Sequence, residues 1–262
     1  MEDTSLRVVA VPVLQDNYSY LIVPPDQQIA AVVDCVEVAP VMAAARDMGV
    51  RITTILSTHH HWDHVGGNAE LAEAQNVSVF GNADDADRIP AITNPVREGD
   101  RISLGSLTAE ILLIPAHTSG HVAYYFAEQR TVFTGDTLFA GGCGRLFEGD
   151  AGQMMGSLDK LNQLPADTKV YFGHEYTIRN LEFAETLEPG SKAIRDKLAW
   201  SRARRREGQP TVPTTLASER ETNPFLRTSS PELRSALERH FPDSDDQDET
   251  RFAQTRLLKD EF

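Results

Sequence analysis

Four apolar segments of this sequence each end in a histidine or an aspartate, and this arrangement limits the folds that the chain can adopt. The segments lead into THHHWDH at residues 58–64, HTSGH at 117–121, Asp136, and GHE at 173–175. Seven of the eight histidines lie in the first, second and fourth of these stretches. Strand ends on a rigid sheet are a recurring place for catalytic groups. We therefore expect a sheet-based fold that carries a metal-type site at its strand ends.

The first stretch has the spacing of a metal-binding motif. Residues two apart in an extended segment point the same way, so His59 and His61 can converge on one ion. Asp63 and His64 come where the chain turns into the Gly66-Gly67 helix start, and they can face a second ion. Imidazole and carboxylate groups suit zinc or another first-row divalent metal.

The other candidate ligands are less specific when each is taken alone. His117 and His174 could each be an ordinary, partly buried histidine, and Asp136 in a Gly-Asp-Thr context could be a turn or N-cap residue. A role as metal ligands is nevertheless favoured for these three residues, because the first motif needs further ligands to complete a metal site. Three neighbours are expected to pack against the site or to contact its ligands: His60, Trp62 and His121.

The order of the predicted elements gives the expected architecture. Apolar patterns predict strands at 6–12, 18–23, 29–33, 52–57, 107–114, 122–126, 131–134 and 169–172, with a hairpin turn at 15–17 and helices at 38–48 and from about 65. Helices are then predicted at 178–187, 193–207, 231–241 and 250–258, with a solvated acidic connector at 242–250. Strands in hairpins followed by a mixture with helices indicate two sheets covered by helices. We expect an α/β protein with a β-rich domain at 1–175 and a helical C-terminal domain at 176–262.

Charge and cysteine content argue against several classes of function. The net charge of −14 opposes binding to phosphate backbones, and the one dense basic run, SRARRR at 201–206, is typical of a solvated helix face. No apolar run approaches the roughly 20 residues that cross a bilayer, and the N-terminus MEDTSLRVV lacks the features of a secretory signal. Two cysteines are too few for a disulfide framework. We expect a cytoplasmic monomer that binds neither nucleic acid nor membrane.

The motifs resemble those of the metallo-β-lactamase superfamily, whose signature is His-x-His-x-Asp-His with a later His, Asp and His. Over nearly the whole chain the resemblance narrows to the hydroxyacylglutathione hydrolases, also called glyoxalase II. It rests on THHHWDHVGGN (58–68), HTSGH (117–121), GDTLFAGGCGRLFEG (135–149), GHEYT (173–177), NPFLR (223–227) and RLLKDEF (256–262). The resemblance implies a four-layer αββα sandwich followed by a helical C-terminal domain.

The resemblance also implies a ligand set for two divalent ions. The first ion would be bound by His59, His61 and His117, the second by Asp63, His64 and His174, and Asp136 would bridge both. Zinc is the expected metal, and iron or manganese would suit the same residues.

The substrate that the resemblance implies is S-D-lactoylglutathione, hydrolysed to D-lactate and glutathione as the second step of methylglyoxal detoxification. Its two free carboxylates would require local cations in so acidic a protein. Arg145, Arg256 and Lys259 resemble the residues that hold the glycine carboxylate, and Tyr176 matches a tyrosine that contacts the tripeptide. Many eukaryotic members have Lys-x-Tyr where this chain has Arg145-Leu146-Phe147. The missing tyrosine hydroxyl contact can be offset by a bidentate Arg145.

Two metal ions about 3.5–4 Å apart can lower the pKa of a shared water from about 15.7 toward about 7. We expect the resulting hydroxide to attack the thioester carbonyl, with Asp63 orienting the nucleophile as well as binding metal.

Four alternative functions share part of the pattern. An antibiotic-degrading β-lactamase would be expected to carry a signal peptide, and the N-terminal sequence does not predict one. A glutathione persulfide dioxygenase uses one iron and fewer ligands, and the complete second ligand set weighs against it. A lactonase of the superfamily would not need glutathione-binding cations. A catalytically inactive, RNA-binding member would show eroded ligands or a basic surface.

Overall fold

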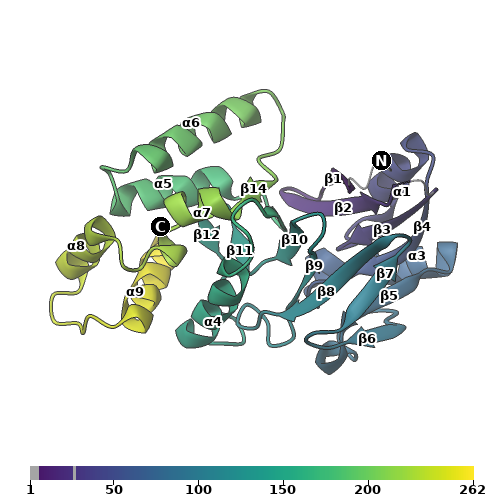
Figure 1. Ribbon diagram of the computed structural model, residues 1–262, viewed down its shortest axis with the longest axis horizontal. Coiled ribbons are helices and arrows are strands. Elements are labelled where there is room, and N and C mark those ends of the chain that lie inside the picture. Colours follow the sequence, from purple (N-terminus) through teal and green to yellow (C-terminus); the bar gives the residue numbers. More distant parts are fainter. Residues whose placement is uncertain (1–5, 26–27) are drawn as a thin grey trace. The chain divides into compact units, whose positions relative to one another are not determined.

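The structure is a computed structural model that describes residues 6–25 and 28–262 (Figure 1). The expectation for the extreme N-terminus falls largely on residues 1–5, which lie outside the described residues. The chain divides into two compact units. The first is Met1–Leu113, Gly120–Gly135 and Tyr171–His174, and the second is Ile114–Ser119, Asp136–Val170 and Glu175–Phe262. The domain boundary expected at residues 175–176 stays a prediction.

One six-stranded sheet contains the N-terminal strands in the order β1-β2-β3-β4-β5-β6. Its members are β1 (Arg7–Val13), β2 (Asn17–Val23), β3 (Ile29–Val33), β4 (Arg51–Leu56), β5 (Ser78–Asn82) and β6 (Asn94–Val96). β1 and β2 form the predicted antiparallel hairpin, and β3 through β6 pair in parallel. Because β3 and β4 are parallel neighbours, the residues that follow them, including Asp34 and the 58–64 motif, emerge at one edge of the sheet.

A second six-stranded sheet has the order β14-β13-β10-β9-β8-β7. It is made of β7 (Arg101–Leu104), β8 (Leu107–Leu113), β9 (Val122–Phe126), β10 (Thr131–Gly135), β13 (Lys169–Phe172) and β14 (Thr214–Thr215). A separate two-stranded sheet pairs β11 (Leu138–Phe139) with β12 (Gly142–Cys143). β8 and β10 both run antiparallel to β9, so they end at the same edge of the sheet.

Within the first unit the two sheets pack face to face through aromatic residues. The ring of Tyr20 on β2 lies 5.5 Å from that of Phe133 on β10 and 5.2 Å from that of Tyr171 on β13. Its hydroxyl donates to the carbonyl oxygen of Phe172 at 2.5 Å. The hydroxyl of Tyr124 on β9 donates to the carbonyl oxygen of Ser57 at 2.8 Å. These contacts form the predicted sandwich of two sheets.

Helices cover the opposite face of the first sheet. Leu21 and Val32 alternate with the residues that face the second sheet, and they join one buried cluster with Val41 of α1 (Val38–Asp47) and Leu71 of α3 (Asn68–Gln75). This period-two alternation places a helix layer outside the first sheet.

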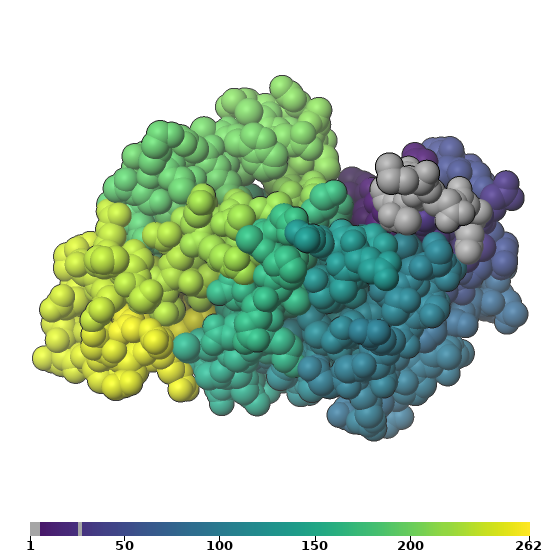
Figure 2. Space-filling view, in the orientation of Figure 1, coloured from purple at the N-terminus to yellow at the C-terminus, as the bar shows by residue number. Residues whose placement is uncertain are grey.

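The second unit is largely helical. It contains α4 (Ala151–Asn162), α5 (Thr177–Leu187), α6 (Lys192–Arg206), α7 (Leu216–Thr222), α8 (Pro231–His240) and α9 (Asp248–Glu261), the last two coloured yellow-green to yellow in Figures 1 and 2. The four predicted C-terminal helices are confirmed within a few residues. No helix of the described part of the chain combines the length and apolar composition needed to cross a membrane.

The acidic connector expected at 242–250 is shorter than predicted. α9 already begins at Asp248, so Asp248 and Glu249 form its acidic first turn. Carboxylates are favourable there because they interact with the unpaired amides and the positive end of the helix dipole. Asp246 also pairs with both Arg234 and Arg251, so the connector is tied to its flanking helices as well as solvated.

A buried charge organises the second unit around the loop that follows Asp136. Glu219 of α7 is fully buried and pairs with Lys197 of α6. Its carboxylate also accepts hydrogen bonds from the Gly141 amide at 2.8 Å and from the Asn223 side chain at 3.1 Å. The same Asn223 amide donates to the carbonyl oxygens of Phe139 at 3.2 Å and Gly142 at 3.0 Å. α6 and α7 are therefore fastened to the β11–β12 hairpin.

We expect Lys197→Met to lower the free energy of unfolding by about 3–5 kcal/mol, because it leaves the buried Glu219 without its cation. Urea denaturation of the purified protein measures this change. Lys192→Met on the same helix is the matched control, because it breaks an exposed pair with Asp196 and is expected to cost less than about 1 kcal/mol. Equal losses of stability in the two variants would contradict the role of the buried pair.

Candidate metal centre

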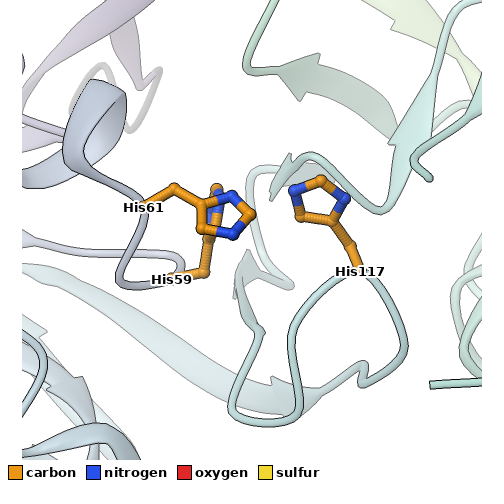
Figure 3. A group of neighbouring side chains, drawn as sticks. All are labelled: His59, His61 and His117. Atoms are coloured by element: carbon orange, nitrogen blue, oxygen red, sulfur yellow. The ribbon is translucent and has the colours of Figure 1, made fainter. Parts of the chain in front are cut away.

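The segment after β4 brings two histidine rings together. His59 is fully buried and His61 is partly buried. The Nε2 atom of His59 lies 3.1 Å from the Nδ1 atom of His61, and Figure 3 draws the two rings next to each other on this loop. Two nitrogens that approach the same point can share one cation when both present lone pairs. The two nitrogens lie as close together as strand periodicity predicted, and their binding of one ion stays a prediction.

The tautomer of His59 follows from its neighbours. The hydroxyl of Thr58 donates to Asp34 Oδ2 at 2.8 Å, so its proton is already used. The Thr58 oxygen is then free to accept from His59 Nδ1, which lies 3.0 Å away. With its proton held on Nδ1, His59 presents the lone pair of Nε2 to an ion.

A second group is formed by Asp63, His64 and His174. Their ligand-type atoms all lie within 4.8 Å of one another, and the Nε2 atoms of His64 and His174 are 3.3 Å apart. Asp63 Oδ2 lies 3.5 Å from His174 Nε2 and 3.8 Å from His64 Nε2. The short helix α2 (Trp62–Val65) turns Asp63 and His64 toward His174, which follows β13. One carboxylate and two imidazoles form a donor set that suits a first-row divalent ion.

Both histidines of this second group are backed by carboxylates. His64 Nδ1 lies 2.9 Å from Asp34 Oδ2, and His174 Nδ1 lies 2.9 Å from Asp16 Oδ1. Asp34 directly follows β3 in a left-handed conformation with φ of 53°, and its other oxygen accepts from the Thr58 amide at 2.8 Å. A carboxylate that accepts the Nδ1 proton fixes the ring and leaves Nε2 as the metal ligand.

In the second unit, His117 and Asp136 lie together. They follow β8 and β10, and His117 Nε2 is 3.6 Å from Asp136 Oδ2. His117 Nδ1 donates to the carbonyl oxygen of Arg145 at 2.9 Å. The proton is therefore on Nδ1, and Nε2 carries the lone pair, as in His59, His64 and His174. A Cβ at Gly144 would lie 2.0 Å from the Asp136 carbonyl oxygen and 2.9 Å from His117 Nδ1, so only glycine fits this approach.

Of the three residues expected to pack against the site, His60 and His121 contact other side chains and Trp62 is exposed. His60 turns to the buried Asp85, with Nδ1 and Oδ2 3.2 Å apart, and the ring of His121 stacks on that of His59 at 4.6 Å. Trp62 was expected to pack against the site, and this prediction is wrong, because its side chain is 71% exposed. The turn of α2 that directs Asp63 and His64 inward leaves Trp62 on the outside.

Two of the three cations that the sequence singled out contact Asp260 in the second unit, and the third, Lys259, precedes Asp260 in the chain. Arg256 is buried and donates to Asp260 Oδ1 at 3.0 Å and to the Cys143 carbonyl oxygen at 2.9 Å. Its Nε atom is buried without a hydrogen-bond partner in the described part of the chain. Arg145 Nε lies 3.6 Å from Asp260 Oδ1. Lys259, three residues after Arg256, donates to the carbonyl oxygen of Arg179 at 3.2 Å.

Burial lowers the pKa of Lys259 to about 8, and the positive charges of Arg256 and Arg179 add to this shift. Its ammonium lies 5.1 Å from the ring centres of Phe183 and Phe262, which shield it from water. The charged form is therefore held in a poorly solvated place, where an anionic partner would stabilise it.

Two aromatic rings stand close to these groups. Tyr176 is 37% exposed and packs edge-on against Phe139 at 5.5 Å. Phe147 is 60% exposed and lies edge-on to His117 at 5.2 Å. Both rings are available at the surface of the second unit.

Sequence reasoning missed several acidic and polar residues that hold the candidate ligands or the segments next to them. Asp34 ends the apolar strand β3 in the way that Asp136 ends β10, so its position carried the same signal. Asp16 and Asn17 were assigned only to a hairpin turn, and Asp85 and Glu219 had no distinguishing pattern. These four contact groups that are distant in the sequence.

Known protein families match the chain along most of its length. The metallo-beta-lactamase superfamily matches residues 14–174, and the hydroxyacylglutathione hydrolase C-terminus matches residues 175–262. A hydroxyacylglutathione hydrolase from Methylococcus capsulatus is 50% identical over 232 residues, which cover 88% of this chain and 91% of that protein. One from Rhodospirillum rubrum is 46% identical over 259 residues, covering 99% of this chain and 100% of the relative.

Solved structures show the same fold. ETHE1 from Myxococcus xanthus aligns with a TM-score of 0.66 and 24% identity, over 98% of this chain and 99% of that one. TTHA1623 in a di-iron-bound form aligns with a TM-score of 0.60 and 27% identity, over 84% of this chain and 100% of that one. The predicted fold class is therefore confirmed. The chain belongs to the metallo-β-lactamase superfamily and, within it, to the hydroxyacylglutathione hydrolase family.

Proposed function

We propose that this protein is a metal-dependent thioester hydrolase that converts S-D-lactoylglutathione and water to D-lactate and glutathione. Two features of the chain carry the proposal. One is the metal-type group of Asp63 with the buried His64 and His174, and the other is the group of cations near Asp260. Relatives that match over nearly the full length carry the name hydroxyacylglutathione hydrolase. A lactonase would not need the cations, and a persulfide dioxygenase would not need the complete second ligand set.

The proposed centre holds two divalent ions. The first would bind His59, His61 and His117, the second would bind Asp63, His64 and His174, and Asp136 would bridge them. In support, the first unit brings His59 Nε2 within 3.1 Å of His61 Nδ1 and the ligand-type atoms of Asp63, His64 and His174 within 4.8 Å of one another. Within the second unit, His117 Nε2 lies 3.6 Å from Asp136 Oδ2. Zinc suits this mixed imidazole and carboxylate set, and iron or manganese would also fit it.

When bound, such ions supply a nucleophile at neutral pH and a positive field for the oxygen of the scissile carbonyl. The residues of the chain supply the rest. Asp63 is proposed to orient the attacking water in addition to binding metal, and Asp136 to hold the two ions at a fixed separation. The leaving group is a thiol with a pKa of about 8.5, which departs as the thiolate, so no strong general acid is needed.

The anionic glutathione moiety is proposed to bind at the cluster of Arg145, Arg256 and Lys259, with Tyr176 contacting the tripeptide. The buried Nε of Arg256 supports this assignment, because a carboxylate would satisfy it. Phe147 offers a ring edge-on to His117 in place of a tyrosine hydroxyl. In a chain of net charge −14, such a local cluster is the means by which an anionic substrate is attracted.

We also propose that the protein works in the cytoplasm as a monomer and binds neither nucleic acid nor membrane. The composition supports this proposal. The proposed division into a catalytic domain at 1–175 and a helical domain at 176–262 is supported by the two family matches, which meet between residues 174 and 175.

The direct test is thiol release from S-D-lactoylglutathione by the purified, metal-analysed protein, followed with a thiol reagent. We expect rapid release that a chelator abolishes and that added divalent metal restores. Oxygen uptake with glutathione persulfide and hydrolysis of simple lactones are the parallel assays. Protein that carries two metals but releases no thiol would retain the site and refute the substrate.

Asp136→Ala is expected to lose metal and thioesterase activity together, because it removes the carboxylate shared by both proposed ion sites. Elemental analysis after gel filtration and the thiol-release assay measure the two effects on one sample. The exposed Asp47→Asn variant on α1 serves as the control. Two retained metals with the full rate would show that Asp136 does not bridge.

The Michaelis constant for the thioester is expected to rise between about pH 7 and pH 9, because Lys259 loses its charge near its pKa of about 8 and the charged form is the one that binds a carboxylate. Lys259→Met should raise KM at pH 7 about tenfold or more, the effect of a lost charge-assisted hydrogen bond, and should remove this part of the pH dependence. Initial rates from pH 6 to pH 9 test this, with Lys192→Met as the control. The same pH dependence of KM in Lys259→Met and Lys192→Met would contradict the role of Lys259.

A further inference from the structure

The turn of the N-terminal hairpin reaches the second ligand group. β1 ends at Val13 and β2 begins at Asn17, so the turn consists of residues 14–16. The Tyr18 amide donates to the carbonyl oxygen of Gly173 at 2.9 Å, and Asn17 and His174 form an antiparallel bridge. Backbone pairing therefore holds this turn directly beside His174.

Asp16 faces the side of the His174 ring that is turned away from the other ligands. Its Oδ1 lies 2.9 Å from His174 Nδ1, while His174 Nε2 is directed at His64 and Asp63. The Asp16 side chain is 38% exposed, and its carboxylate forms an ion pair with His174. The ion pair with His174 therefore holds the Asp16 carboxylate behind this ring.

Asn17 fixes the third member of the group. It is buried, and its Nδ2 donates to Asp63 Oδ2 at 3.1 Å and to the Asp63 carbonyl oxygen at 3.0 Å. The same Oδ2 lies 3.5 Å from His174 Nε2. The two bonds from one amide set both the backbone and the side chain of Asp63, so the carboxylate oxygen is aimed at the two imidazoles.

The Nδ1 partners of His59 and His117 differ in charge from those of His64 and His174. In the first group, His59 and His117 give their Nδ1 protons to a hydroxyl and to a backbone carbonyl. In the second group, His64 and His174 give theirs to the carboxylates of Asp34 and Asp16. Carboxylates raise the basicity of an imidazole ligand more than neutral acceptors do, and loss of such a partner typically weakens a metal site about 10- to 100-fold.

We propose that Asp16 and Asn17 are positioning residues that set the affinity of the second metal site independently of the first. The proposal rests on the two-ion site of the proposed function. Asp16 of the hairpin turn places a carboxylate behind His174, and Asn17 at the start of β2 fixes Asp63.

The test is metal release from purified protein loaded with Zn²⁺ and dialysed against a graded series of chelator concentrations, with bound zinc measured by elemental analysis. For Asp16→Asn we expect one of the two ions to be released at about 10- to 100-fold lower chelator strength, and the other at the wild-type strength. Asp47→Asn removes the same charge from the exposed end of α1 and should release both ions as the wild type does. Wild-type release of both ions from Asp16→Asn, or equal weakening of both, would overturn the proposal.

Two further variants separate positioning from a general loss of structure. Asn17→Ala should weaken the same ion, and Asp16→Glu should restore part of the affinity that Asp16→Asn loses. The thermal midpoint of the metal-free Asp16→Asn protein should stay at the wild-type value, and a lower midpoint with both ions weakened would assign Asp16 a structural role instead. A wild type that binds a single ion would overturn both proposals, whereas a wild type with two ions and no thiol release would overturn the substrate alone.

Discussion

The candidate metal centre depends on where each of its imidazoles keeps its single proton. A neutral imidazole has one donor and one acceptor nitrogen, so it binds a cation through the nitrogen whose proton is held elsewhere. Here the Nδ1 atoms of His64, His174 and His117 contact Asp34, Asp16 and the Arg145 carbonyl, each at 2.9 Å. All three rings are buried, so an unpaired Nδ1 would be costly. The acceptors therefore select the tautomer and stabilise the site at the same time.

Parallel pairing explains how one of these acceptors comes to its histidine. β3 and β4 are neighbours in the first sheet, and Asp34 follows β3 just as the His-rich motif follows β4. The Asp34 carboxylate consequently bridges to the Thr58 amide, the Thr58 hydroxyl and His64. Its left-handed backbone, with φ of 53°, is unusual for a residue other than glycine, and aspartate tolerates it better than most. This local strain is compensated by the three contacts that it makes possible.

The sequence predicted what local patterns encode and missed what the tertiary structure assembles. β3, β9 and β13 match their predicted residues, because apolar runs bounded by turn residues are a local signal. α4 was not predicted, because Gly152 and Gly156 weaken its helical pattern, although Asp150 and Gln153 form a capping box. The helical start of α9 inside the acidic connector was missed because charge alone resembles a solvated loop.

The same distinction holds within the candidate site. The His-x-His-x-Asp-His motif is local, so the pairing of His59 with His61 could be predicted from strand periodicity. The contact between Asp16 and His174 joins residues that are 158 positions apart, and no spacing rule reaches that far. The cations of α9 were identified through the family resemblance, because a terminal helix of this composition is otherwise typical of a solvated surface. The burial of Arg256 shows that this helix end is packed.

The cationic cluster resolves a conflict between the charge of the whole chain and the charge of its proposed substrate. Arg145 and Arg256 both approach the carboxylate of Asp260, which lies one helical turn after Arg256. Lys259 is influenced by the positive charges of Arg256 and Arg179 and by the acids Glu182 and Asp260. Arg145 adds a further cation beside Asp260, so cations are concentrated here in a protein of net charge −14. Asp260 lowers the repulsion between the cations and holds them close together. An anionic substrate completes the neutralisation, and the shielded ammonium of Lys259 gains most from it because water stabilises that charge poorly.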